Sequence, residues 1–213
     1  MTGRNTKIKI CGITTIEDAR LSADLGAYAL GFNFYKKSPR YIAPEKAQEI
    51  CEQLPDGVLK VGVFVNESLN EILHIAKTAG LDAVQLHGEE SPEFANDLKR
   101  ETNLRVIKAF RVSPDFVAAR VLKYNVDAIL LDAFSKSLHG GTGHTFDWKV
   151  AKNVTAIFPK MFLAGGLSPA NVAKAVDAVA PYGIDACSGL ESQPGVKDKS
   201  KLREFFTLAN ESV

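Results

Sequence analysis

Residues 7–15 read KIKICGITT, and this stretch contains the structural unit that the rest of the chain repeats. Lysine alternates with isoleucine as in a half-buried strand, a glycine follows Cys11, and threonines then stand where a helix would begin. A strand, a tight turn and a helix make one β-α unit. The fold therefore depends on how often this unit recurs.

Eight short apolar runs follow one another along the 213 residues, most of them rich in β-formers and each followed by an amphipathic stretch. They are IKICGI (8–13), ALGFNF (29–34), LKVGVFV (59–65), AVQLHG (83–88), RVIKAF (105–110), AILLDA (128–133), MFLAGG (161–166) and GIDACSG (183–189). Helix starts lie between them, and we expect Thr15, Ser91 and Ser168 to be N-caps, the last two followed by proline at the first helical position.

Eight units of roughly 27 residues are close to the minimum size of strand–helix–strand repeats. Parallel strands joined by helices close at this number into a (β/α)8 barrel, so we predict an α/β protein with a single TIM-barrel domain over residues 1–213. A doubly wound open sheet is the alternative. The unit count and the lack of a dinucleotide-binding fingerprint in the sequence favour the barrel.

Composition restricts the functional classes. With 26 basic and 25 acidic side chains the formal charge is +1, which argues against a general nucleic-acid or membrane-surface binder. No apolar segment reaches the roughly 18 residues that a membrane helix needs, and the polar start MTGRNTK does not resemble a signal peptide. Three scattered cysteines do not make a disulfide framework. We expect a cytoplasmic protein.

Strand alternation predicts which side chains enter the barrel. If Ile8 and Ile10 face the helices, Lys9 and Cys11 point inward. The same alternation sends Asp132 inward at the end of AILLDA, and it sends Gln85 and His87 inward on AVQLHG. Polar groups of three strands would then meet at the carboxyl-terminal mouth, where barrel enzymes keep their active sites.

Two of these residues are candidates for acid–base chemistry. Cys11 is either a small buried thiol or a base at a strand tip, and the second role requires a nearby cation or helix N-terminus that lowers its pKa. Asp132 either closes an Asx turn or acts as an acid opposite the thiol. Cys51 lies in a helix pattern and is interpreted as packing, whereas Cys187 either lines the mouth or fills it.

Other groups predict an anionic ligand. Arg40, with two lysines nearby, follows the second strand; it is either a solvated loop residue or a fork for a carboxylate. Turns after the seventh and eighth strands offer backbone amides of the kind that bind phosphate. The residues of these turns are Gly165, Gly166, Ser188 and Gly189. The glycine-rich stretch after the sixth strand, within residues 135–144, is interpreted as a mobile lid.

Three further polar residues have simpler interpretations. His87 lacks a second ligand at local spacing, so we expect no metal site. Lys108 is expected to point inward, where it is either a Schiff-base lysine or, the favoured interpretation, a structural one. Asp185 is interpreted as interior polar packing or as support for a catalytic group.

The chain resembles phosphoribosylanthranilate isomerase, the third enzyme of tryptophan biosynthesis. Its matching segments are KICGIT, GFNFYKKSPRYI, VGVFVN, VQLHGEE, ILLDA with GGTGHTFDW, LAGGLSPANV, and DACSGLES with PGVKD. They run in the family's order over nearly the whole chain, and KICGIT followed by SPRYI is the most specific pair. The resemblance implies a barrel fold, an Amadori rearrangement of N-(5′-phosphoribosyl)anthranilate, no cofactor or metal, and no partner beyond this phosphosugar, as a monomer or homodimer.

The resemblance also implies roles. Cys11 would be the base that takes the proton from the sugar C2′, and Asp132 the acid that protonates the ring oxygen. Arg40 would hold the anthranilate carboxylate, Gln85 and His87 would contact the substrate, and the four turn residues would hold its phosphate. One departure is the run DACSGLE, where the family usually has DVSSGVE; this leaves the role of Cys187 open.

Three rival functions remain at this point. The histidine-pathway aminoaldose isomerase performs a similar reaction but has an aspartate at the tip of its first strand, where this chain has Cys11. Indole-glycerol-phosphate synthase would depend on Lys108 as its acid. A non-enzymatic protein that binds a phosphate ligand is the third.

Overall fold

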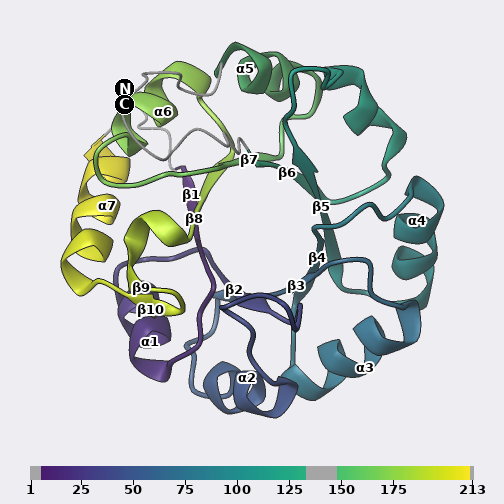
Figure 1. Ribbon diagram of the computed structural model, residues 1–213, viewed down its shortest axis with the longest axis horizontal. Helices are drawn as coiled ribbons and strands as arrows, with labels where there is room; N and C mark the ends of the chain where they lie inside the picture. Colours follow the sequence, from purple (N-terminus) through teal and green to yellow (C-terminus); the bar gives the residue numbers. More distant parts are fainter. Residues whose placement is uncertain (1–5, 133–147, 212–213) are drawn as a thin grey trace.

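The computed structural model describes residues 6–132 and 148–211, and in them eight parallel strands close into a barrel in sequential order (Figure 1). The strands are β1 (Lys7–Cys11), β2 (Ala29–Asn33), β3 (Leu59–Phe64), β4 (Ala83–Leu86), β5 (Arg105–Arg111), β6 (Ala128–Asp132), β7 (Met161–Ala164) and β8 (Gly183–Ala186). The ring closes because β1 pairs with β8, with Lys9 opposite Asp185. The predicted barrel is confirmed, and the open sheet is excluded.

Helices surround the barrel, as Figure 1 shows. They are α1 (Ile16–Asp24), α2 (Pro44–Cys51), α3 (Leu69–Ala79), α4 (Pro92–Glu101), the 3-10 helix η1 (Ala118–Lys123), α5 (Trp148–Ile157), α6 (Val172–Val179) and α7 (Lys199–Glu211). The unit after β5 thus carries a short 3-10 helix in place of an α-helix. Between β8 and α7 lie a second 3-10 helix, η2 (Ser188–Leu190), and the antiparallel hairpin of β9 (Glu191–Gln193) and β10 (Val196–Lys197).

The helix starts agree with two of the three predicted N-caps. The Thr15 hydroxyl accepts from the amide of Asp18 and the Ser91 hydroxyl from that of Phe94. Ser168 was wrong: α6 begins three residues later, after Asn171. The side-chain oxygen of Asn171 accepts from the backbone amide of Ser168 at 2.9 Å, and the backbone amide of Asn171 donates to the carbonyl oxygen of Ser168. These residues therefore form a turn before the helix.

Alternation along the strands separates two apolar layers. The layer between strands and helices includes Ile10, Val84 and Ile129, which confirms the predicted outward direction of these side chains. The barrel interior holds a smaller cluster, which consists of Ala29, Val61, Ala83, Ile107, Ala109, Ala128, Leu130, Phe162 and Ala164. Ala83 on β4 and Leu130 on β6 belong to this interior cluster, so Gln85 and Asp132, two residues further along each strand, also point inward.

Lys108 does not point into the barrel as predicted. Its neighbours Ile107 and Ala109 belong to the interior cluster, so Lys108 faces the helices. There its ammonium group contacts Glu90 at 2.8 Å and the carbonyl oxygen of Gly88 at 2.7 Å. The run RVIKAF is apolar on both faces, and its sequence gives no alternation from which the direction could be derived.

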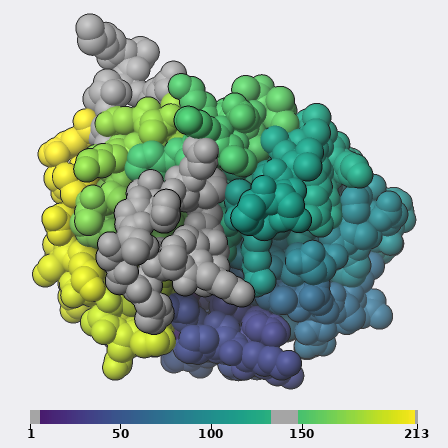
Figure 2. Space-filling model, turned by 45° about the horizontal axis from the view of Figure 1, so that its top comes forward, coloured from purple at the N-terminus to yellow at the C-terminus, as the bar shows by residue number. Residues whose placement is uncertain are grey.

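The surface follows the same circular order. In Figure 2 the segments pass from purple through blue and teal to green and yellow, so the C-terminal part of the chain lies beside the N-terminal part. Within the part of the chain that the structure describes, no helix is long and apolar enough to cross a membrane. The predicted lid at residues 135–144 lies outside the described residues.

Candidate active site

Two thiols meet at the carboxyl ends of β1 and β8. Cys11 is the last residue of β1 and Cys187 follows β8 directly; both are partly exposed. The interaction between their side chains lowers the pKa of Cys11 well below its usual range and raises the pKa of Cys187. Cys11 is therefore the thiolate of the pair.

Positively charged side chains near Cys11 stabilise its thiolate form. Burial opposes ionisation of Cys11, but the charges of Lys9, Lys197 and His87 lower its pKa. Lys9 is almost fully buried and pairs with Asp185 at 2.7 Å. Burial raises the pKa of Asp185 to about 6, against the opposing effect of Lys9. The predicted interior polar role of Asp185 is thus an ion pair that keeps a cation beneath Cys11.

Lys197 is the cation that sequence reasoning missed. It lies on β10 with no exposed side-chain surface, and its ammonium nitrogen is 2.7 Å from the carbonyl oxygen of Cys11. The same nitrogen is 3.1 Å from a carboxylate oxygen of Glu191 and 3.9 Å from the sulfur of Cys187. The hairpin after β8 therefore brings a buried positive charge to the thiol pair.

Glu191 connects this charge to Arg40. Nε and Nη2 of Arg40 donate to the two carboxylate oxygens of Glu191 at 2.8 and 2.6 Å. A guanidinium group has five N–H donors in a planar fork, so this bidentate contact leaves the Nη1 side available to another anion. Arg40 is thus held at the mouth by a resident carboxylate and is not a freely solvated loop residue.

The predicted acid lies across the barrel with a histidine beside it. Asp132 ends β6, and one of its carboxylate oxygens is 3.5 Å from Nε2 of His87. Nδ1 of His87 is 2.8 Å from the side-chain amide nitrogen of Gln85. When that amide donates, the neutral ring carries its hydrogen on Nε2, facing Asp132. Gln85 is fully buried, so it reaches a ligand only through His87.

The two glycine turns lie against each other. Gly165 and Gly166 follow β7 with φ values of 96° and 68°, which non-glycine residues rarely adopt. Gly189 in η2 packs so close to the loop after β7 that a Cβ atom there would overlap the carbonyl oxygen of Leu167. The turns after β7 and β8 therefore form one continuous rim, and Ser188 begins the second of them.

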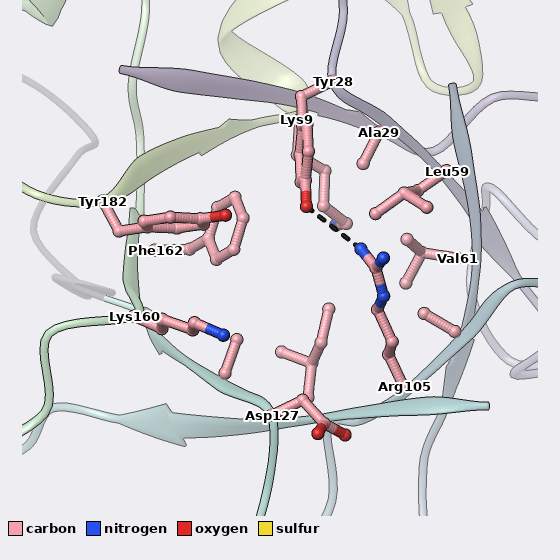
Figure 3. A pocket seen from close by; sticks show the side chains of 13 residues that line it. Lys9, Tyr28, Ala29, Leu59, Val61, Arg105, Asp127, Lys160, Phe162 and Tyr182 are labelled. Carbon is pink, nitrogen blue, oxygen red and sulfur yellow. Dashed lines mark hydrogen bonds between the residues drawn. The ribbon is translucent and has the colours of Figure 1, made fainter. Parts of the chain in front are cut away.

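A separate cavity of about 330 Å³ opens at the other end of the barrel. Its lining includes the first residues of β3, β5 and β6, which are Leu59, Arg105 and Ala128. Figure 3 shows the Arg105 guanidinium directed at the hydroxyl group of Tyr28, 3.2 Å away. None of the predicted site residues lines this cavity. This cavity is thus distinct from the cluster formed by Cys11, His87 and Asp132.

The structure brings Cys11, Arg40, His87 and Asp132 to the carboxyl end of the barrel, together with the two glycine turns. Sequence reasoning missed Glu191 and Lys197, although both stand in segments on which the family resemblance rests, DACSGLES and PGVKD. In residues 6–132 and 148–211 there is no group of three or more histidine, cysteine, aspartate or glutamate residues suited to hold a metal ion.

Titratable groups gathered at the carboxyl ends of eight parallel strands are the arrangement of a (β/α)8-barrel enzyme. The sequence profile of the family described as N-(5'phosphoribosyl)anthranilate (PRA) isomerase matches residues 8–208. The chain belongs to this family.

Individual proteins to which the chain is similar carry the same name. It is 50% identical to the N-(5'-phosphoribosyl)anthranilate isomerase of Pelobacter propionicus over 206 residues, which are 97% of this chain and 96% of the relative. A solved phosphoribosyl anthranilate isomerase in complex with reduced 1-(o-carboxyphenylamino)-1-deoxyribulose 5-phosphate is 43% identical, with a TM-score of 0.85 and coverage of 96% and 98%. Monomers generated from the dimeric Thermotoga maritima enzyme match with the same TM-score, 0.85, at 43% identity and the same coverage, 96% and 98%.

Proposed function

We propose that this chain converts N-(5′-phosphoribosyl)anthranilate to 1-(2-carboxyphenylamino)-1-deoxyribulose 5-phosphate in tryptophan biosynthesis. The observation that carries the proposal is the placement of a thiolate, Cys11, and a carboxyl group, Asp132, on different strands at one barrel mouth. An aldose–ketose rearrangement needs one group that gives a proton and one that takes a proton. A solved relative binds a reduced product of this chemical type.

The first step assigned to this site is ring opening. Asp132, in its protonated form, gives its proton to the ring oxygen of the ribose. The sugar ring then opens to an iminium ion between C1′ and the anthranilate nitrogen. His87 holds the Asp132 carboxyl group in place, and Gln85 orients the His87 ring. This arrangement supports a positioning role for His87 and Gln85.

The second step is proton transfer from carbon. The iminium charge acidifies the proton on C2′, and the Cys11 thiolate removes it to leave an enolamine. This species tautomerises to the ketose product: the Cys11 thiol returns its proton to C1′, and the proton lost from the C2′ hydroxyl restores the acid form of Asp132. Lys9 and Lys197 lower the pKa of Cys11 before the substrate binds, so a larger share of this base is ionised than in a free thiol.

Two anionic ends fix the substrate between these groups. The free Nη1 side of Arg40 is assigned to the anthranilate carboxylate, and Glu191 holds the guanidinium in the required orientation. The phosphate is assigned to the rim formed by Gly165, Gly166, Ser188 and Gly189. Binding energy from both ends then orients the reacting carbon between acid and base.

Observations on single residues weigh against the rival enzymes. A synthase that uses Lys108 as its acid would need that side chain in the barrel, whereas Lys108 faces the helices and binds Glu90. The histidine-pathway isomerase would need a carboxylate at the position of Cys11. We also propose that the protein acts in the cytoplasm, as a monomer or homodimer, with the phosphosugar as its sole ligand.

Rescue of a tryptophan auxotroph that lacks phosphoribosylanthranilate isomerase tests the function in one experiment. We expect growth with the wild-type chain and none with Cys11→Ala at the same expression level. Failure of the well-expressed wild-type chain would contradict the enzymatic proposal and favour a protein that only binds a phosphate ligand. The purified chain should also form the ketose product from N-(5′-phosphoribosyl)anthranilate without added metal or cofactor.

A further inference from the structure

The strand register places Cys11 directly beside Cys187. Lys9 lies opposite Asp185 and Ile10 opposite Ala186 where β1 pairs with β8, and the two cysteines are the next residues on these segments. Neighbouring strands are about 4.8 Å apart. A disulfide requires Cα atoms about 4.4 to 6.8 Å apart. The backbone spacing therefore suits a covalent bridge.

The side chains also point the same way. Lys9 and Asp185 both enter the barrel and form an ion pair at 2.7 Å, which shows that inward side chains on these two strands meet. By the same alternation, Cys11 and Cys187 are the next inward residues toward the mouth, two positions beyond Lys9 and Asp185. Both are partly exposed, whereas Cys51, the third cysteine, is buried in α2.

The two sulfurs differ in reactivity. The interaction of the two thiols lowers the pKa of Cys11 and raises that of Cys187, so Cys11 supplies the thiolate, whereas the Cys187 thiol donates to the Glu191 carboxylate at 3.8 Å. Lys197 lies 3.9 Å from the Cys187 sulfur and stabilises negative charge when that thiol ionises. A partly exposed thiolate with a second thiol on the neighbouring strand is the arrangement of an attacking and a resolving cysteine.

We propose that Cys11 and Cys187 form a site of reversible oxidation, at which a hydroperoxide converts the two thiols into an intramolecular disulfide. The Cys11 thiolate attacks one peroxide oxygen, and with one proton the products are Cys11 sulfenic acid and water. The Cys187 sulfur then attacks the sulfenic sulfur and releases a second water. Two thiols are oxidised by two electrons, and hydrogen peroxide is reduced to two waters.

The expected consequence is reversible loss of activity, and this part rests on the proposed role of Cys11 as base. A sulfur in a disulfide carries no negative charge and is not a base, so it takes no proton from C2′. Cys187 has no step in the proposed rearrangement, so the resolving thiol is not required by that reaction.

The experiment exposes the full-length chain to hydrogen peroxide at equimolar amounts, with intact mass, peptide mapping and turnover measured on the same samples. We expect loss of two hydrogen atoms, a peptide that links Cys11 to Cys187, and a fall in turnover of at least about tenfold that dithiothreitol reverses. Cys51→Ala should give the same link. Cys187→Ser and Cys187→Ala should instead gain oxygen at Cys11. Dithiothreitol should not reverse this oxidation once sulfinic acid has formed.

Sulfinic acid at Cys11 of the wild-type chain without any link to Cys187 would overturn the proposal, as would a link only between molecules. Formation of the link with turnover unchanged would confirm the oxidation site but contradict Cys11 as the base. The two proposals therefore fail in distinguishable ways.

Discussion

The ammonium nitrogen of Lys197 lies 2.7 Å from the carbonyl oxygen of Cys11, although 185 residues separate the two along the chain. The contact exists because β1 and β8 close the barrel and the β9–β10 hairpin folds back over their ends. It places a fully buried positive charge next to the thiol that we assign as the base. The pKa of Cys11 is thereby linked to a short hairpin outside the barrel repeat.

Lys197→Met should move the pH dependence of catalysis. Loss of the cation raises the pKa of Cys11, so the rising limb of the kcat/KM profile should shift to higher pH while activity at high pH is largely retained. Lys199→Met, an exposed position at the start of α7, is the matched control. An unshifted profile in a folded Lys197→Met enzyme would mean that Lys197 does not act on the base.

Arg40→Ala should weaken substrate binding more than it slows the chemical step. The guanidinium contacts the carboxylate end of the substrate, which does not react, so KM should rise at least about tenfold with a smaller change in kcat. Arg40→Lys should recover little, since an ammonium group lacks the planar fork that Glu191 and the substrate share. Steady-state kinetics of both variants provide the test; full recovery by lysine would contradict bidentate binding.

Asp132→Asn should reduce kcat by about a hundredfold to ten thousandfold, because an amide has no proton to give to the ring oxygen. KM should change little, since volume and hydrogen bonding are nearly conserved. His87→Asn should give a smaller loss, as expected of a residue that acts through Asp132. A larger loss in the His87 variant than in the Asp132 variant would reverse the two assignments.

Removal of one partner of the buried pair Lys9–Asp185 should destabilise the fold. Lys9 is 1% and Asp185 7% exposed, so Asp185→Leu removes the carboxylate that pairs with a buried ammonium group. We expect the free energy of unfolding in urea to fall by about 3–5 kcal/mol. The double variant Lys9→Met with Asp185→Leu should recover much of this loss, because neither charge remains. If it were no more stable than the single variant, the cost would come from packing and not from the charge.

Sequence periodicity was sufficient where strands alternate clearly. On β1 and β4 the direction of Cys11 and His87 follows from polar residues between apolar ones, on β6 Asp132 is the one polar residue of the strand, and the meeting of the three follows from barrel closure. Periodicity failed at Lys108, since RVIKAF is apolar on both faces, and at Ser168, where a local turn with Asn171 precedes the helix.

The hairpin residues could not be placed from the sequence. Glu191 and Lys197 lie in segments of three and two residues, too short for any periodic signal. Their contacts with Arg40 and Cys11 span more than 150 residues, so only the closed fold brings them together. The sequence offered one indication of their role, since both are charged residues that follow the last barrel strand, where the chain passes the mouth of the barrel.

The central claim is that the Cys11 thiolate removes the C2′ proton, and the turnover of N-(5′-phosphoribosyl)anthranilate by purified Cys11→Ala tests it most directly. With Cys51→Ala as a control for loss of a buried thiol, we expect the Cys11 variant to lose about a hundredfold to ten thousandfold in kcat while the control stays near wild type. A folded Cys11→Ala enzyme with wild-type kcat would contradict the account.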